Sequence, residues 1–170
     1  MKKILLTAVN AKYIHSNLAV YSLRAYAREL KENIVLAEYT INNRTEYILR
    51  EIYLKKPDVI CFSCYIWNIS IILEVAEEFH KLCPKVTIWV GGPEVSYEVE
   101  AFLKEHPFIT GVIIGEGEKT FSELCRYYVK GEGSLEEMKG IALFDGAGNV
   151  QIHESQEILD MNTIPFCYDL

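Results

Sequence analysis

The sequence predicts an α/β fold of three layers, with helices on both faces of a five-stranded parallel sheet. Short apolar runs recur between residues 4 and 115, and each is followed by a segment whose apolar residues recur every three or four positions. This alternation of strands and helices favours parallel strands joined by right-handed crossovers. The first run, residues 4–9, also lacks the polar–apolar alternation of a half-exposed strand, which is typical of strands covered on both faces.

Five segments carry the strand pattern. They are residues 4–9, 34–41, 58–63, 86–90 and 111–115. In a flavodoxin-like, or Rossmann-like, arrangement their order in the sheet is 2-1-3-4-5. Ligands bind such sheets outside the carboxyl ends of the strands, where the order reverses, here between the first and the third strand.

The helices between these strands are marked by apolar stripes at helical spacing. The stripes consist of Ala19, Leu23, Tyr26 and Leu30; Ile48 and Ile52; Ile69, Leu73 and Ala76; Val95, Val99 and Phe102; and Phe121, Leu124, Cys125 and Tyr128. Ser16 or Asn17 is expected to cap the first helix. Asn43 and Glu46 have the spacing of a capping box, which predicts the start of the second, and Pro57 ends it.

The character of the chain changes after the last long helix. Residues 140–144 and 150–153 flank a turn-prone stretch and predict a small antiparallel hairpin. Residues 154–170 have no periodicity. We therefore expect a Rossmann-like domain over 1–133, a β-hairpin appendage over 134–153, and a linker over 154–170 that leads to a further domain, so that the chain would be a fragment of a longer protein.

Charge and cysteine content restrict the partners. The net charge is −7, and no basic cluster is available to neutralise phosphates, which argues against a nucleic acid or an anionic membrane as partner. The five cysteines are odd in number and lie in or beside apolar segments, which favours a reducing, cytoplasmic location. No stretch approaches the ~20 apolar residues of a membrane span.

Two neighbouring strands end in glycines and acids. Residues 86–90 lead into Gly91, Gly92, Pro93 and Glu94, and residues 111–115 lead into Glu116, Gly117 and Glu118. Glycine allows a ligand to approach the main chain closely. We therefore expect one shared pocket, bordered by the loops 10–17, 63–68, 91–94 and 115–118.

The residues of these loops do not match several protein classes that share this fold. A receiver domain needs carboxylates after the first strand and an aspartate at the end of the third, where Asn10, Ser63 and Cys64 stand. The first loop has no glycine for a flavin phosphate. The stretch 115–120 resembles a nucleotide phosphate loop, but Glu118 replaces the glycine that should precede Lys119. The dinucleotide fingerprint is absent.

Five segments, in their order and spacing, resemble a known family. They are the first strand with its polar loop, residues 56–63, 90–94 and 115–118, and the closing Ile164-Pro165-Phe166. Together they are similar to the amino-terminal cobalamin (vitamin B12)-binding domain of radical S-adenosylmethionine (radical SAM) enzymes. The resemblance covers nearly the whole chain.

The resemblance implies that a corrin ring rests across the strand ends while its nucleotide tail descends beside the sheet. The residues expected along the cofactor are Tyr13, His15, Ser63, Cys64, Gly91, Gly92, Pro93, Gly115, Glu116 and Gly117. The cobalt-ligating histidine of the methionine-synthase type stands in Asp-x-His-x-x-Gly. Here Tyr13 and Leu18 replace the acid and the glycine, so we do not expect His15 to ligate cobalt.

Several other residues resemble functional residues but can also be explained by packing or helix electrostatics. Cys61 and Cys64 have a C-x-x-C spacing, but an odd separation along a strand places them on opposite faces, so we expect two packed thiols and no metal site. The three-cysteine cluster of an iron–sulfur centre is missing. Tyr65 and Trp67 are candidates to roof a macrocycle, or ordinary packing residues. Glu116 and Glu118 either border the cofactor or complement a helix dipole.

The expected function is therefore that of a cobalamin-binding domain in a B12-dependent radical SAM enzyme of methyltransferase or cyclase type. The chain itself should bind the corrinoid without catalytic residues of its own. The iron–sulfur cluster and S-adenosylmethionine (SAM) would belong to the radical SAM domain of the same protein, which would chiefly specify the substrate. The alternatives are a cofactor-free interaction or regulatory domain and a small-molecule transferase.

Overall fold

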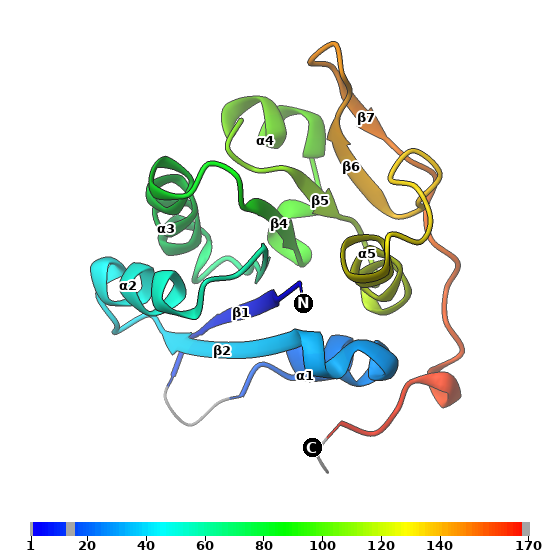
Figure 1. Ribbon diagram of the computed structural model, residues 1–170, viewed down its shortest axis with the longest axis horizontal. Helices are drawn as coiled ribbons and strands as arrows, with labels where there is room; N and C mark the ends of the chain where they lie inside the picture. The colour runs from blue at the N-terminus through cyan, green and yellow to red at the C-terminus, as the bar shows by residue number, and fades with distance from the viewer. Residues whose placement is uncertain (1, 13–15, 168–170) are drawn as a thin grey trace.

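The computed structural model describes residues 2–12 and 16–167 and confirms the predicted α/β fold (Figure 1). The strands are β1 (Ile4–Asn10), β2 (Ile34–Thr40), β3 (Val59–Ser63), β4 (Thr87–Gly91), β5 (Gly111–Ile113), β6 (Ile141–Phe144) and β7 (Val150–Ile152). The α-helices are α1 (Leu18–Tyr26), α2 (Thr45–Lys55), α3 (Ile69–Leu82), α4 (Val99–Glu105) and α5 (Glu118–Lys130). Short 3-10 helices cover Arg28–Asn33, Pro93–Val95 and Met161–Thr163.

The sheet has the order β2-β1-β3-β4-β5-β6-β7, and its first five strands are parallel, in the predicted order. Helices α1 and α5 lie on one face, and α2, α3 and α4 lie on the other (Figure 1). The pleat of β3 divides the core between these faces, since Ile60 packs toward α2 and α3 while Cys61 packs toward α1 and α5. The three predicted layers are therefore present.

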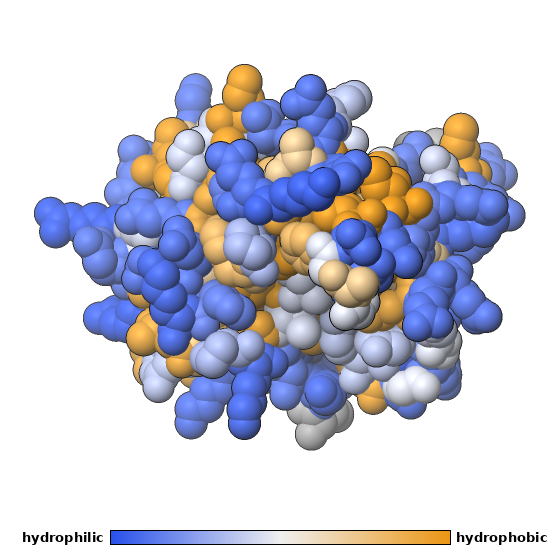
Figure 2. All heavy atoms as spheres, turned by 90° about the horizontal axis from the view of Figure 1, so that it is seen from above, coloured by the Kyte–Doolittle hydropathy of each residue, from blue (hydrophilic) through white to orange (hydrophobic). Residues whose placement is uncertain are grey.

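The C-terminal hairpin extends the same sheet. Strand β6 pairs antiparallel with β5, and β7 pairs antiparallel with β6. A Cβ at Gly111 in β5 would lie 2.5 Å from the Trp89 ring and 2.7 Å from the Ala142 carbonyl, so only glycine permits this close packing. The side of the molecule that carries α4 and the hairpin is mainly hydrophilic, with a smaller hydrophobic area among the polar side chains (Figure 2).

One predicted helix start was wrong in its detail. Helix α2 begins at Thr45 after Arg44, and no side chain caps it. The Asn43 side chain instead turns back, and its Oδ1 accepts a hydrogen bond from the Thr40 backbone N–H at 2.8 Å. Asparagine bonds local backbone groups in turns as readily as at caps, so the capping-box spacing with Glu46 did not decide between the two.

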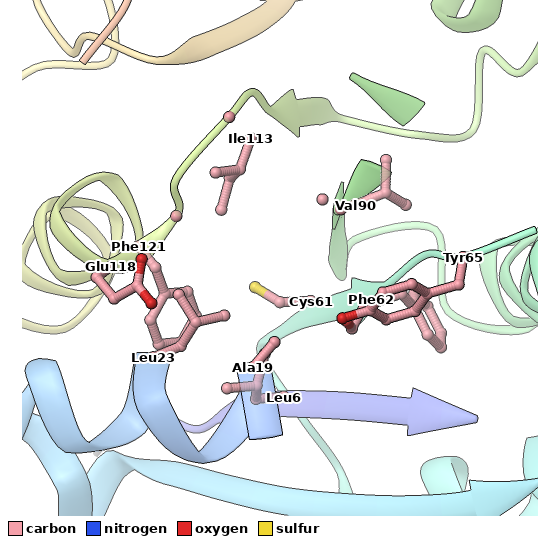
Figure 3. A pocket seen from close by; sticks show the side chains of 15 residues that line it. Leu6, Ala19, Leu23, Cys61, Phe62, Tyr65, Val90, Ile113, Glu118 and Phe121 are labelled. Atoms are coloured by element: carbon pink, nitrogen blue, oxygen red, sulfur yellow. The ribbon is translucent and has the colours of Figure 1, made fainter. Parts of the chain in front are cut away.

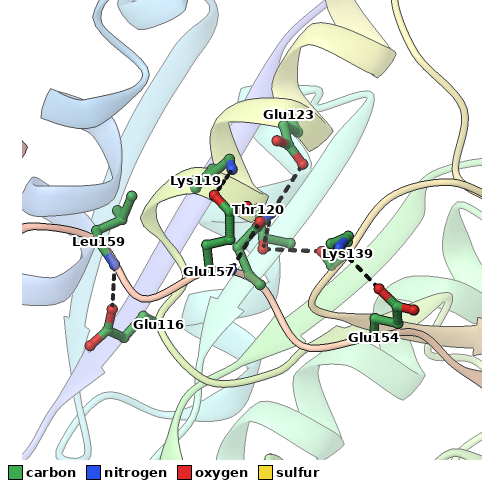
Figure 4. A network of polar contacts seen from close by, with 9 residues as sticks. Glu116, Lys119, Thr120, Glu123, Lys139, Glu154, Glu157 and Leu159 are labelled. Carbon is green, nitrogen blue, oxygen red and sulfur yellow. Dashed lines mark hydrogen bonds and ion pairs between the residues drawn. The ribbon is translucent and has the colours of Figure 1, made fainter.

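The tail after the hairpin runs along α5 (Figure 4). Lys139 pairs with Glu154 at 3.0 Å, and Lys119 pairs with Glu157 at 3.1 Å. The Leu159 backbone N–H donates to Glu116 Oε2 at 3.4 Å. Each exposed ion pair contributes little to stability. The tail is therefore held by several weak contacts together, these ion pairs and the hydrogen bond of the Leu159 N–H among them. Within residues 2–12 and 16–167, no helix is both long and apolar enough to cross a bilayer.

Candidate functional site

A cavity of about 110 Å³ opens at the carboxyl ends of the parallel strands, between α1, α5 and the sheet. Side-chain or backbone atoms of Leu6, Ala19, Leu23, Cys61, Phe62, Ser63, Tyr65, Val90, Gly91, Gly92, Ile113, Gly115, Gly117, Glu118 and Phe121 line it. We call it the α1–α5 slot. Figure 3 shows the side chains of Ala19, Leu23, Cys61, Ile113 and Phe121 converging on this space from the two helices and the sheet.

The slot has an apolar lower part and a polar rim. Leu6 and Cys61 are partners in the β1–β3 register, and Cys61 precedes Ser63 by two residues, roughly 6–7 Å further from the strand ends. Phe121 closes this lower part from α5 and is fully buried. Ser63 and Glu118 supply polar side chains at the rim. An aromatic or aliphatic group therefore fits below, and hydroxyl or amide groups fit above.

The predicted glycines have different roles. Gly92 has φ +115°, and a Cβ there would lie 2.4 Å from the Cys64 carbonyl oxygen, so this glycine permits contact between two loops of the protein itself. A Cβ at Gly117 would lie 3.1 Å from Leu23 Cδ2, which brings α5 close to α1. Gly115, with φ +75°, has open space around its Cβ position. Among these three, Gly115 leaves free room at the rim.

The two cysteines of the C-x-x-C spacing lie on opposite faces, as predicted. Cys61 faces the slot, and Cys64 packs toward α3 in the other core. Burial raises the pKa of both thiols, which keeps them protonated at neutral pH. In the described part of the chain, no group of three or more His, Cys, Asp or Glu residues is arranged to hold a metal ion.

The two glutamates after β5 diverge. Glu118 lines the slot, and its Oε1 accepts a hydrogen bond from Ser22 Oγ on α1 at 2.9 Å. Glu116 instead contacts the tail through Leu159 (Figure 4). Pro93 begins a 3-10 helix next to the slot and does not line it. Tyr13 and His15 lie outside the described residues.

Aromatic residues follow β3 at the rim. The rings of Tyr65 and Trp67 stack with centroids 4.5 Å apart and planes inclined by 6°. Tyr65 also lines the slot, while Trp67 is 46% exposed. A stacked pair that is partly exposed beside a cavity offers a flat apolar surface to a ligand above the strand ends.

Sequence reasoning missed two residues that hold the rim in place. Glu38 on β2 accepts hydrogen bonds from Asn10 Nδ2, the Asn17 backbone N–H and the Tyr21 hydroxyl, and so fixes both ends of the β1–α1 loop. The hydrogen bond to Glu38 raises the pKa of the Tyr21 hydroxyl. Asn68, buried before α3, donates to the carbonyls of Val9 and Ser63 at 3.0 Å each, which ties the ends of β1 and β3 together. The available sequence signal for Glu38 was a charged residue within the mostly apolar strand predicted over residues 34–41.

A known protein family matches most of this chain. The family model of the B12 binding domain matches residues 4–125, which include every described residue that lines the slot. The chain belongs to the B12-binding domain family. This cobalamin-binding assignment disfavours the cofactor-free alternative. It also agrees with a polar rim above an apolar slot at the switch point of the sheet.

The relatives of this B12-binding domain are much longer proteins, of which it matches only a part. It is 38% identical over 69 residues to the cobalamin-dependent radical SAM methyltransferase TokK of Streptomyces tokunonensis, covering 41% of this chain and 10% of that protein. It is 26% identical over 123 residues to hopanoid C-3 methylase of Methylococcus capsulatus, covering 71% and 24%. This chain therefore spans a quarter or less of these relatives.

Solved structures show the same fold. The cobalamin-dependent SAM radical enzyme OxsB, with aqua-cobalamin and SAM bound, superposes with a TM-score of 0.77 at 21% identity, covering 95% of this chain and 23% of OxsB. The receiver domain of the response regulator RcsB from Escherichia coli superposes with a TM-score of 0.51 at 11% identity, covering 78% and 96%. That likeness concerns the fold alone, because Asn10 and Ser63 stand where receiver carboxylates would be needed.

Proposed function

We propose that this B12-binding domain holds cobalamin with its corrin ring across the strand ends and its nucleotide tail in the α1–α5 slot. It would serve a larger radical SAM enzyme of methyltransferase or cyclase type, whose radical SAM domain carries the iron–sulfur cluster and SAM. The names of its relatives support this assignment. We place the protein in the reducing cytoplasm, since its cysteines are all free.

The single observation that carries the proposal is the size and position of the slot. A cavity of about 110 Å³ is well below the roughly 300–1,000 Å³ of pockets that enclose a whole ligand. It suits one arm of a large cofactor, with the rest outside. Cobalamin has this shape, because a bulky macrocycle carries a flexible tail that ends in an aromatic base.

The residues proposed to border the cofactor keep the predicted set, with roles refined by their contacts. Ser63 would offer its hydroxyl at the rim, where no described residue pairs with it. Gly91, Gly115 and Gly117 would form the rim walls. The further predicted residues are Tyr13, His15, Cys64, Gly92, Pro93 and Glu116. Of these, Cys64 and Gly92 would act by shaping the β4 loop, since the Cys64 N–H donates to the Gly91 carbonyl at 2.7 Å.

The bound cofactor would supply the methyl-transfer or radical chemistry at cobalt. The domain's own share is to bind, orient and shield. Glu38 and Asn68 keep the rim loops fixed, and the stacked Tyr65 and Trp67 give the ring an apolar neighbour. The described residues of the slot give no specific support to the transferase alternative.

Equilibrium dialysis against hydroxocobalamin tests the proposal. We expect saturable binding of about one equivalent, read from the corrinoid absorbance that the protein retains. Burial of the apolar base in the preformed slot should contribute roughly 1.5–3 kcal/mol to this binding. Absence of binding, both by this chain and by a chain extended through a following domain, would contradict the proposal.

A further inference from the structure

Glu118 is unusual among the residues of the α1–α5 slot. It is the only charged side chain among the described residues that line the cavity (Figure 3). One carboxylate oxygen, Oε1, accepts the hydrogen bond from Ser22 on α1. The other, Oε2, has no partner within residues 2–12 and 16–167. An ionised carboxylate offers several acceptor positions, so Glu118 retains capacity toward the cavity.

The position of Glu118 at the rim of the slot limits which part of a bound cofactor its side chain can contact. It begins α5 at the rim, one helical turn before Phe121, which closes the apolar lower part. In the tail of cobalamin, a ribose joins the aromatic base to a phosphate. If the base fills the space beside Cys61 and Phe121, the sugar directly attached to it comes to the level of the rim.

We propose that Glu118 is a cofactor-recognition residue, whose carboxylate accepts hydrogen bonds from the ribose hydroxyls of the nucleotide tail. This inference rests on the proposed function. A carboxylate is an acceptor only, so it suits hydroxyl donors and disfavours the nearby phosphate. Glu118 would therefore set how deep the tail descends. Ser22 acts as a positioning residue, because its hydroxyl holds the Glu118 carboxylate at the rim.

Two corrinoids separate recognition of the tail from recognition of the ring. Cobinamide has the corrin ring of cobalamin but lacks the phosphate, the ribose and the base. We expect Glu118→Gln to weaken cobalamin binding about 10-fold, since hydrogen bonds to a charged acceptor are roughly twice as strong as neutral ones. Binding of cobinamide should stay within about 2-fold of wild type, because it has no ribose to lose. Both dissociation constants would be measured by absorbance titration.

A matched variant and a stability measurement complete the test. Glu123→Gln makes the same change on α5, at a carboxylate that accepts from Gln156 and does not line the slot, and should change neither affinity. Ser22→Ala should weaken cobalamin binding less than Glu118→Gln does and leave cobinamide unaffected. Thermal midpoints of all variants show whether they are folded.

The outcomes distinguish this inference from the proposed function. Equal loss of both corrinoids on Glu118→Gln would show that Glu118 only holds α1 against α5, and unchanged or tighter cobalamin binding would show that it meets no donor. Either result overturns the inference about Glu118 and leaves the proposed function of the domain standing. If the wild-type protein binds neither corrinoid, both as this chain and as a chain extended through a following domain, the proposed function fails as well.

Discussion

Ala19→Trp should abolish most cobalamin binding while the protein remains folded. Ala19 lines the α1–α5 slot from α1 and is partly exposed, so a larger side chain there can occupy the cavity without entering the packed core (Figure 3). Excluding the aromatic base removes the roughly 1.5–3 kcal/mol that its burial supplies. We expect the dissociation constant for cobalamin to rise about 100-fold in absorbance titrations.

The control for this variant is the same substitution elsewhere. Ala101 is exposed on α4, on the opposite face of the sheet, and Ala101→Trp should bind cobalamin like wild type. Cobinamide should bind Ala19→Trp nearly as well as wild type does, because it brings no base. If Ala19→Trp binds cobalamin as tightly as Ala101→Trp, the tail does not enter the slot.

Gly92→Ala should give the largest loss of stability among single substitutions at the rim. Gly92 has φ +115° and ψ 174°, a backbone region that is essentially restricted to glycine, and the new Cβ would lie 2.4 Å from the Cys64 carbonyl oxygen. Both strain and clash must be relieved by backbone movement. We expect a loss of about 3 kcal/mol in the free energy of unfolding, and a thermal midpoint lower by roughly 6–12 °C.

Gly115→Ala is the matched comparison. Gly115 also has a positive φ, of +75°, but its Cβ position is open. Only the left-handed backbone penalty of about 1 kcal/mol applies, so the midpoint should fall by roughly 2–4 °C. Calorimetry would measure the thermal midpoints of the Gly92→Ala and Gly115→Ala variants. Equal losses would mean that the contact between Gly92 and Cys64 does not constrain the β4 loop.

The fold was largely predictable because its signals are local and repeated. Buried parallel strands require unbroken apolar runs, and the helices between them require stripes, so β1 to β5 and their order followed from the pattern. The hairpin was predicted as an appendage, but its pairing with β5 was not. Pairing between distant segments depends on complementary edges, such as Gly111 against Ala142, which one strand alone does not reveal.

The site was predictable at the level of loops and less so at the level of side chains. Glycines at strand ends pointed to the rim of the α1–α5 slot. Glu116 and Glu118, two residues apart, diverge because α5 begins at Glu118, whose side chain is directed toward α1. Glu116 instead lies in the loop before the helix, where it contacts the tail. Glu38 and Asn68 were missed because their partners come from other strands.

The absorption spectrum of bound methylcobalamin tests the central claim most directly. In free methylcobalamin at neutral pH, the nucleotide base coordinates cobalt, and a base inserted in the α1–α5 slot cannot do so. We therefore predict that the protein-bound cofactor shows the blue-shifted, base-off spectrum, and that the Ala19→Trp variant does not produce it. A bound cofactor with the base-on spectrum of the free compound would contradict the account.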